Sequence, residues 1–267
     1  MVNNSEPAIV QTKQREILSL LRNPANGNSL VFEDDVMVDP ITEEQFEIRN
    51  GIPVIIQKDD VFGNNRKQQI AYDWFSYAYD LMYALPLSSL QQWLDELAEI
   101  ITIESGERVL ETSVGTGQQF RNFARRGVDG HFFGNDISYG MLNKCRKNLR
   151  KWDIDVGLVQ GNAEALPFQS ERFDVVFHVG GFNFFNDKQA AIDEMIRVAK
   201  PDAKVYIVDE TSEFINLPQA VVRLIPERVT RVADPPVDLV PDNMHDVSST
   251  KIANGKFWLV SFRNPSK

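Results

Sequence analysis

Residues 108–117 read Arg-Val-Leu-Glu-Thr-Ser-Val-Gly-Thr-Gly, and this stretch decides the fold. Its apolar Val-Leu pair is typical of a short buried strand, and Glu111 stands at the end of that strand. The turn from Gly115 to Gly117 follows, and apolar residues at helical spacing begin at Phe120. A strand, a glycine turn and a helix in this order predict an element that cradles a nucleotide.

Glu111 indicates which kind of nucleotide this element binds. A carboxylate at the strand end repels the pyrophosphate of a dinucleotide and attracts a cofactor that carries an ammonium group. Counted from Gly115 and Gly117, the third glycine position of a dinucleotide motif is occupied by Phe120. Its ring is too large for the close helix–strand packing of that motif. Both features argue against a nicotinamide-dependent oxidoreductase.

A second acidic residue, Asp136, ends the next apolar run, which contains Phe132 and Phe133. Asp136 lies 19 positions after Gly117, and an acid about 20 residues beyond a glycine turn is where an acceptor for a ribose diol is expected. Two oxygens of one carboxylate match two hydroxyls, and charged hydrogen bonds are the stronger kind. The alternative is that Asp136 caps the helix expected over about residues 139–151.

Four segments resemble the class I S-adenosylmethionine-dependent methyltransferases, especially the group that includes the ubiquinone and menaquinone methyltransferases. They are Val-Leu-Glu-Thr-Ser-Val-Gly-Thr-Gly (109–117), Phe-Phe-Gly-Asn-Asp-Ile-Ser (132–138), Gly-Asn-Ala-Glu-Ala-Leu-Pro-Phe (161–168) and Phe-Asp-Val-Val-Phe-His-Val-Gly-Gly (173–181). The resemblance covers roughly residues 70–210. It implies an α/β fold, with a Rossmann-like seven-stranded sheet whose last strand is antiparallel, and methyl transfer from S-adenosylmethionine.

The resemblance also implies which residues bind S-adenosylmethionine. They are Glu111, Gly115, Gly117, Asp136, Ile137, Met141, Asn162, Ala163 and His178. Asn162 stands where the family commonly has an aspartate that receives the adenine amino group, and an asparagine carbonyl accepts the same bond without a charge. Ser113 stands where the first glycine is usual, so we expect its backbone to avoid positive φ. Ordinary core packing is the alternative for Met141.

Two residues are expected near the transferred methyl group. By the resemblance, Tyr79 in the aromatic segment 71–81 faces the methionine end of the cofactor, where aromatic rings favour a sulfonium. Its alternative is inward packing in an amphipathic helix. His178 follows the strand expected at 175–177 and is either a base near neutral pH or a hydrogen-bonded residue that shapes the pocket. Positioning alone supplies roughly 7–11 kcal/mol, so a base is not required.

Composition limits the substrate and the partners. The 267 residues carry a formal net charge of −10, and 43% of them are apolar. Binding of a nucleic acid requires a basic surface, which this acidic chain lacks in its sequence pattern, so we expect a small, partly apolar substrate. The single cysteine, Cys145, excludes an internal disulfide and a cysteine-based zinc site. No apolar run approaches the roughly 20 residues that span a membrane, and without a secretory pattern cytoplasmic residence is the default expectation.

Residues 1–60 are predicted to form a small N-terminal α+β unit, ahead of a methyltransferase domain over residues 61–267. We expect a helix over about 12–22, strands near 30–32, 36–38, 45–48 and 53–56, and a tight turn at Asn50-Gly51. The layout resembles a zinc ribbon in which Asn23 and Asn26 replace the two cysteines. Asparagine is a poor zinc ligand, so the unit is expected to hold no metal.

Further elements are expected toward the C-terminus: a helix at 88–103, a segment at 214–231 that resembles a substrate lid, and a β-hairpin around Ala253-Asn254-Gly255. The predicted function is methyl transfer to a small molecule in a closed pocket, by in-line displacement. The alternative is a catalytically silent subunit that binds the cofactor or a partner. Ser113, Asn162 and the metal-free N-terminal unit favour that alternative.

Overall fold

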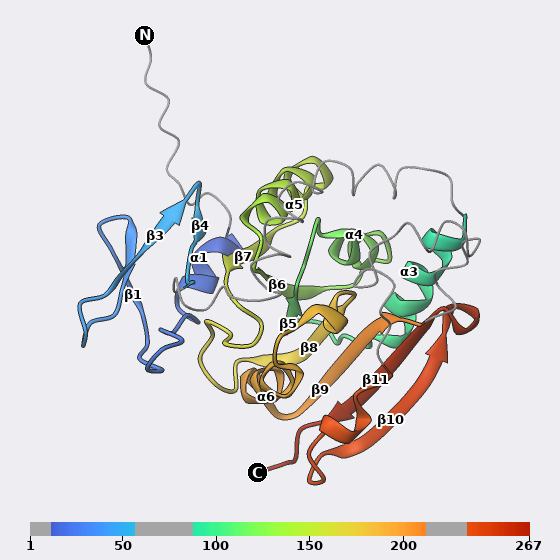
Figure 1. Ribbon diagram of the computed structural model, residues 1–267. Coiled ribbons are helices and arrows are strands. Elements are labelled where there is room, and N and C mark those ends of the chain that lie inside the picture. The colour runs from blue at the N-terminus through green and yellow to red at the C-terminus, as the bar shows by residue number, and fades with distance from the viewer. Residues whose placement is uncertain (1–11, 57–87, 212–233) are drawn as a thin grey trace, which may run out of the picture.

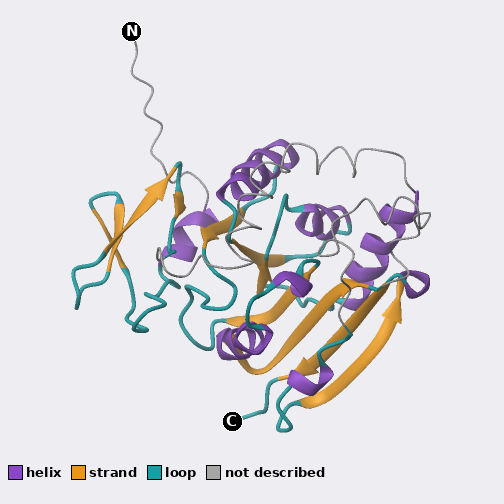
Figure 2. Ribbon diagram, in the orientation of Figure 1, coloured by secondary structure: helices purple, strands orange, loops and turns teal. Residues whose placement is uncertain are grey.

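The computed structural model describes residues 12–56, 88–211 and 234–267, which two sheets organise (Figures 1 and 2). The larger sheet has seven strands in the order β10-β11-β9-β8-β5-β6-β7, and the smaller has four in the order β1-β2-β3-β4. Tyr79 and its segment 71–81, like the expected lid at 214–231, lie outside the described residues.

Five neighbouring strands of the larger sheet run parallel. In chain order they are β5 (Glu107–Thr112), β6 (Gly130–Asp136), β7 (Val156–Gln160), β8 (Phe173–Val179) and β9 (Ala199–Glu210). The predicted hairpin joins β10 (His245–Ile252) to β11 (Phe257–Arg263), and β11 pairs antiparallel with β9. The predicted Rossmann-like sheet with an antiparallel last strand is therefore confirmed.

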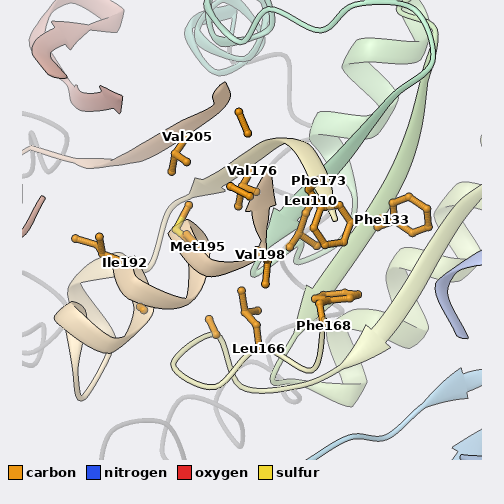
Figure 3. Close-up of a cluster of buried hydrophobic side chains, with 14 of the residues drawn as sticks. Leu110, Phe133, Leu166, Phe168, Phe173, Val176, Ile192, Met195, Val198 and Val205 are labelled. Carbon is orange, nitrogen blue, oxygen red and sulfur yellow. The ribbon is translucent and has the colours of Figure 1, made fainter. Parts of the chain in front are cut away.

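Both faces of the larger sheet are buried by helices, as expected for parallel strands. The described helices of this part are α3 (Ser88–Ile100), α4 (Gln118–Arg125), α5 (Tyr139–Trp152) and α6 (Lys188–Val198). Neighbouring residues of one strand face opposite sides, so Val109 packs in the cluster with α3, α4 and α5, whereas Leu110 packs in the cluster with α6 (Figure 3). In that second cluster Phe133 and Phe173 meet edge to face, 5.7 Å apart between ring centroids. Burial of each such ring stabilises the fold by roughly 1.5–3 kcal/mol.

The short helix α1 (Thr12–Leu18) packs against β6 and β7 as a component of this core. The connection from β7 to β8, residues 161–172, contains no helix but buries Leu166 and Phe168 in the same core. Gly157 in β7 allows the close approach of α1, because a Cβ there would lie 2.7 Å from the carbonyl oxygen of Lys13. Gln14 binds both backbone groups of Leu158 at 2.9 Å.

The smaller sheet is antiparallel and confirms the first three strands expected before residue 60, while the fourth, expected at 53–56, lies at Ile52–Pro53. Its strands are β1 (Val31–Glu33), β2 (Val36–Val38), β3 (Gln45–Arg49) and β4 (Ile52–Pro53). The tight turn is also confirmed, since Asn50 and Gly51 have φ values of 51° and 79°. The helix expected to reach residue 22 instead ends at Leu18. The following residues pair with the 167–168 segment through tertiary hydrogen bonds.

A buried carboxylate organises the first loop of the N-terminal unit, residues 23–28. The side-chain amides of Asn23, Asn26 and Asn28 all donate to Asp39, at 2.9, 2.8 and 3.2 Å. Burial alone would raise the pKa of Asp39, but these bonds and two backbone N–H groups hold that pKa well below its usual range. Asn23 and Asn26, which stand at the positions of the two cysteines, thus both donate hydrogen bonds to the Asp39 carboxylate.

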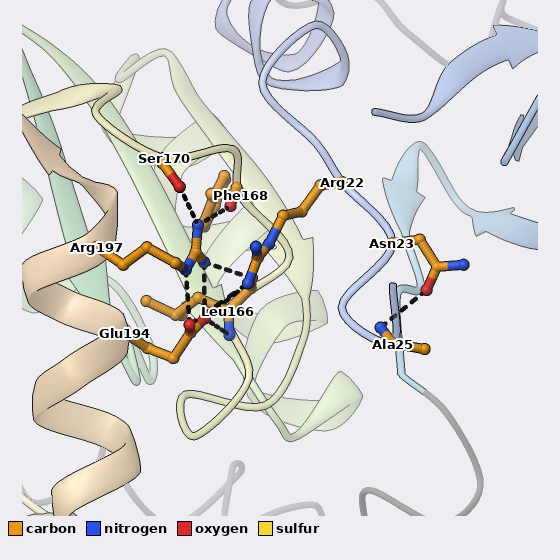
Figure 4. Close-up of polar contacts among 8 residues, drawn as sticks. All are labelled: Arg22, Asn23, Ala25, Leu166, Phe168, Ser170, Glu194 and Arg197. Atoms are coloured by element: carbon orange, nitrogen blue, oxygen red, sulfur yellow. Dashed lines mark hydrogen bonds and ion pairs between the residues drawn. The ribbon is translucent and has the colours of Figure 1, made fainter. Parts of the chain in front are cut away.

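The N-terminal unit is also joined to α6 through an ion-pair network (Figure 4). Arg22 lies 3.4 Å from Glu194, which is paired with Arg197 at 2.6 Å. Arg197 in turn donates to the carbonyl oxygens of Leu166 and Phe168. Arg22, which precedes the loop 23–28, is therefore linked through Glu194 and Arg197 both to α6 and to the β7–β8 connection.

Candidate cofactor site

The carboxyl ends of the parallel strands bring most of the predicted site residues to one edge of the sheet. Cα pairing places Thr112 beside His178, and Asp136 beside Gln160. Glu111 directly precedes Thr112 in β5. Ligands of open parallel sheets bind beyond this edge, so the strands alone assemble the candidate site.

Glu111 is a buried carboxylate that lacks a counter-charge. Its side chain is 3% exposed, and Oε2 has no hydrogen-bond partner among the residues that the structure describes. Burial, and then the negative charge of Asp136, raise the pKa of Glu111 well above its usual range. Leaving a carboxylate buried without a partner is costly unless it is protonated or meets a cation. The position therefore fits the ammonium group of S-adenosylmethionine.

The glycine turn has the geometry of a cradle. A Cβ added at Gly115 would meet no atom of the described residues within 4 Å, so among these residues the backbone is open on this side. Gly117 precedes α4 with a φ of 82°, and a Cβ there would lie 2.8 Å from the sulfur of the buried Cys145. Gly117 is thus required both for its conformation and for close packing against α5.

Ser113 corrects one expectation. Its φ is +62°, so the backbone does adopt the left-handed conformation that we expected it to avoid. Such a conformation costs a non-glycine residue about 1–3 kcal/mol and persists where the surroundings impose it. Here the next residue, Val114, donates its N–H to the carbonyl of Asn135 at 3.0 Å, which fixes the turn to β6.

Asp136 ties the glycine turn to the start of α5. Its Oδ2 accepts the Gly115 N–H at 2.8 Å, and its Oδ1 accepts the Ser138 N–H at 2.9 Å. The alternative that Asp136 caps the helix is wrong, because Ser138 is the cap and accepts the Met141 N–H at 3.1 Å. The carboxylate lies where β6 ends, in the position expected for a ribose acceptor.

The predicted adenine side is formed by the ends of β6 and β7. Met141 is buried on α5, which is compatible both with an adenine contact and with core packing. Asn162 and Ala163 are buried just beyond β7. The side-chain carbonyl of Asn162 accepts the Glu164 N–H at 3.0 Å, so this oxygen already has one partner within the chain. Ile137 is half-buried, and its carbonyl accepts a bond from Gln160 at 2.9 Å.

His178 is completely buried and neutral. Its Nδ1 lies 3.1 Å from the Thr112 hydroxyl, and the rings of Phe182 and Phe185 lie 5.7 and 5.1 Å away between centroids. Burial lowers the pKa of His178 to about 4, against the opposing effect of the Asp209 charge. Such an imidazole is a weak base near neutral pH, so the geometry favours a role in shaping the pocket.

We expect His178 to make folding depend on pH. Because the folded pKa of about 4 lies below the ordinary 6.5, the unfolded chain binds more protons between these values. Stability should therefore be complete above pH 6.5 and fall by roughly 3 kcal/mol as the pH approaches 4. Urea unfolding of the wild type and of His178→Gln across this range measures the difference. Parallel pH profiles would contradict a buried neutral histidine.

Asp209 is a buried residue of this edge that our sequence reasoning left without a role. Its carboxylate accepts the N–H groups of Gly181 and Asn183 at 3.1 and 2.9 Å, and so fixes the turn after β8. The adjacent Glu210 has its pKa raised well above the usual range by burial and then by Asp209. The sequence signal that could have pointed to Asp209 is its position as an acid at the end of a predicted strand.

Part of the large sheet matches a known family by sequence. Residues 110–207 match the sequence model of the family described as "Methyltransferase domain". Over these residues the chain is similar to methyltransferase domains. Its seven-stranded sheet, glycine turn and strand-end acids are those expected for the class I S-adenosylmethionine-dependent type, with S-adenosylmethionine as the cofactor.

Among curated proteins, the chain is similar to two methyltransferases whose names refer to quinones. The chain is 33% identical over 152 residues to the ubiquinone/menaquinone biosynthesis C-methyltransferase UbiE of Idiomarina loihiensis, covering 54% of this chain and 61% of the relative. It is 30% identical over 149 residues to the demethylmenaquinone methyltransferase of Renibacterium salmoninarum, covering 55% and 60%. The chain thus spans about three fifths of the length of these relatives.

Solved structures share the fold at low identity. A methyltransferase from Aquifex aeolicus has a TM-score of 0.53 at 18% identity, covering 64% of this chain and 88% of that one. The phosphoethanolamine N-methyltransferase 2 of Haemonchus contortus, in complex with S-adenosylmethionine, has a TM-score of 0.58 at 16% identity, covering 73% and 57%.

The described residues contain neither a cluster of metal-binding side chains nor a membrane-spanning helix. Within 12–56, 88–211 and 234–267, no group of three or more His, Cys, Asp or Glu side chains is arranged to hold a metal ion. No helix in the described part of the chain is long and apolar enough to cross a membrane.

Proposed function

We propose that the chain transfers a methyl group from S-adenosylmethionine to a small, partly apolar molecule. The observation that carries the proposal is the buried Glu111, whose Oε2 has no hydrogen-bond partner among the described residues, beside a glycine turn that Asp136 holds in place. When bound, the cofactor supplies an electrophilic methyl group on a sulfonium. The chain's own residues bind it, orient it and exclude water.

The predicted residues that the structure describes each have an environment that suits a role at the cofactor. Glu111 would hold the ammonium group, and the open backbone at Gly115 admits the cofactor. Asp136 would accept the ribose hydroxyls with its remaining lone pairs. Ile137, Met141, Asn162 and Ala163 would surround the adenine. We assign His178 a shaping role, and the role of Tyr79 rests on the resemblance alone.

The acceptor is proposed to be apolar in part and not a nucleic acid. A net charge of −10 opposes the approach of a polyanion. Phe184 and Phe185 are half-buried after β8, whereas Phe182 is fully buried and packs against Trp258 in the core. The relatives named for quinone biosynthesis make a quinol-type acceptor the first to test.

A catalytically silent cofactor-binding subunit is the second candidate. Two observations favour it: the strained backbone at Ser113 and the carbonyl of Asn162, which already has a partner. Both weaken the case for tight cofactor binding, but neither removes Glu111 or Asp136 from the site.

Two measurements separate these candidates. Isothermal titration with S-adenosylmethionine and S-adenosylhomocysteine should give stoichiometric binding. Labelled methyl groups should then appear in the small-molecule fraction of a cell extract, or in a demethylated quinol. Binding without transfer to any fraction would support the silent subunit, and label confined to RNA or protein would contradict the proposed acceptor.

A further inference from the structure

The N-terminal unit reaches the cofactor edge of the large sheet through Gln160. Val54, just after β4, forms a parallel bridge with Gln160, the last residue of β7. The next residue, Ile55, donates its N–H to the Gln160 carbonyl at 2.8 Å. The small sheet therefore fixes the backbone of the large sheet at the point where the cofactor site begins.

The side chain of Gln160 continues this contact into the site. It is 4% exposed, and its Nε2 donates to the carbonyl of Ile137 at 2.9 Å. Ile137 lies between Asp136 and Ser138, whose N–H the Asp136 carboxylate accepts. A single buried amide thus orients the short loop that carries the proposed ribose acceptor and the proposed adenine contact.

A second contact fixes the start of α5. Asn50, in the turn between β3 and β4, donates to the hydroxyl of Tyr139 at 2.8 Å, and that hydroxyl donates to the Arg49 carbonyl at 3.2 Å. The Arg49 guanidinium lies over the Tyr139 ring, 4.8 Å from its centroid, and Arg146 donates to the Asn50 carbonyl. Tyr139 is the first residue of α5, two positions before Met141.

We propose that the N-terminal unit is a built-in positioning element for the nucleoside side of the cofactor site, with Gln160 as the positioning residue. This inference rests on the proposed function. The two contacts flank residues 137–138 and hold them before the cofactor arrives. Binding then costs less ordering entropy, and the gain appears as affinity. The unit performs this role through protein contacts, without a metal.

The test compares Gln160→Glu, Tyr139→Phe and Gln14→Ala in the full chain. Gln160→Glu keeps the side-chain size but removes the donor to Ile137, so we expect Kd for S-adenosylhomocysteine to rise about 5- to 20-fold. Tyr139→Phe removes only the hydroxyl, and a rise of about 2- to 5-fold is expected. Gln14→Ala breaks the buried contact of α1 with Leu158, which should lower Tm and leave Kd unchanged.

Hydrogen exchange of the ligand-free proteins supplies a readout that does not depend on the cofactor. Amides of residues 137–142 should exchange faster in Gln160→Glu and at the wild-type rate in Gln14→Ala. Equal Kd values for wild type and Gln160→Glu would overturn the inference, as would an equal rise in Gln14→Ala, which would indicate general destabilisation. A wild-type chain that binds no S-adenosylhomocysteine would overturn the proposed function itself.

Discussion

Asp136→Ala is expected to weaken S-adenosylmethionine binding by about 1.5–3 kcal/mol, which is a rise in Kd of about 10- to 150-fold. The proposed charged hydrogen bonds to the ribose would be lost. The structure adds a second cause, because the same carboxylate accepts the N–H groups of Gly115 and Ser138. Without it, the glycine turn and the start of α5 lose their common partner.

Two further variants separate these causes in the same titration. Asp136→Asn keeps the shape and one acceptor oxygen, so its effect should lie between those of the wild type and the alanine variant. Ser138→Ala removes the helix cap but leaves the carboxylate, and should cost about 1 kcal/mol of stability with little change in Kd. A folded Asp136→Ala protein with the wild-type Kd would remove Asp136 from the site.

The individual parallel strands were predictable because they carry apolar residues that fill both faces, whereas the seven-stranded arrangement was implied by the family resemblance. Pairs such as Val109-Leu110 and Val175-Val176 each place one residue in either core cluster, and this local pattern is visible in the sequence. Strand ends, glycine turn and hairpin follow from equally local signals. The elements that the structure confirms are those that are determined by neighbouring residues in the sequence.

Long-range contacts account for what the sequence did not reveal in the fold. Nothing local indicates that α1 covers β7, since Gln14 and Leu158 are 144 positions apart. The need for Gly157 becomes clear only when Lys13 is placed against it. Likewise, the three asparagines of the loop 23–28 predict a turn, but they do not indicate that all three side-chain amides donate to Asp39.

The site divides in the same way. Glu111, Gly117 and Asp136 could be proposed as site residues because the chemistry of each follows from its place at a strand end or turn. The positive φ of Ser113 could not, since it is imposed by the bond from Val114 to β6. The role of Gln160 depends on the N-terminal unit, to which no motif connects it.

Cofactor binding is expected to release a proton from Glu111. In the free protein, burial and the charge of Asp136 raise the pKa of Glu111 well above its usual range, so the protonated form is favoured. An ammonium group beside it stabilises the carboxylate and lowers that pKa. Binding therefore ionises Glu111, and affinity should increase with pH until the pH exceeds the pKa of the free protein.

The same shift predicts the stability of the free protein. A carboxyl group whose folded pKa is raised binds more protons in the folded chain than in the unfolded chain, above pH 4.5. The Glu111 contribution to stability should thus be lost as the pH rises from that value through the folded pKa. Glu111→Gln, which is neutral and nearly isosteric, should lack this loss and be the more stable protein at high pH.

Glu111→Gln also provides the decisive binding test. We expect it to weaken S-adenosylhomocysteine binding by about 3–5 kcal/mol, because the buried ammonium would lose its counter-charge. Titration calorimetry in two buffers with different heats of ionisation measures the released proton directly. The wild-type heat should depend on the buffer, whereas any residual heat of Glu111→Gln should not. Buffer-independent wild-type binding, together with a variant of equal affinity, would place the ammonium elsewhere and leave Glu111 a buried structural acid.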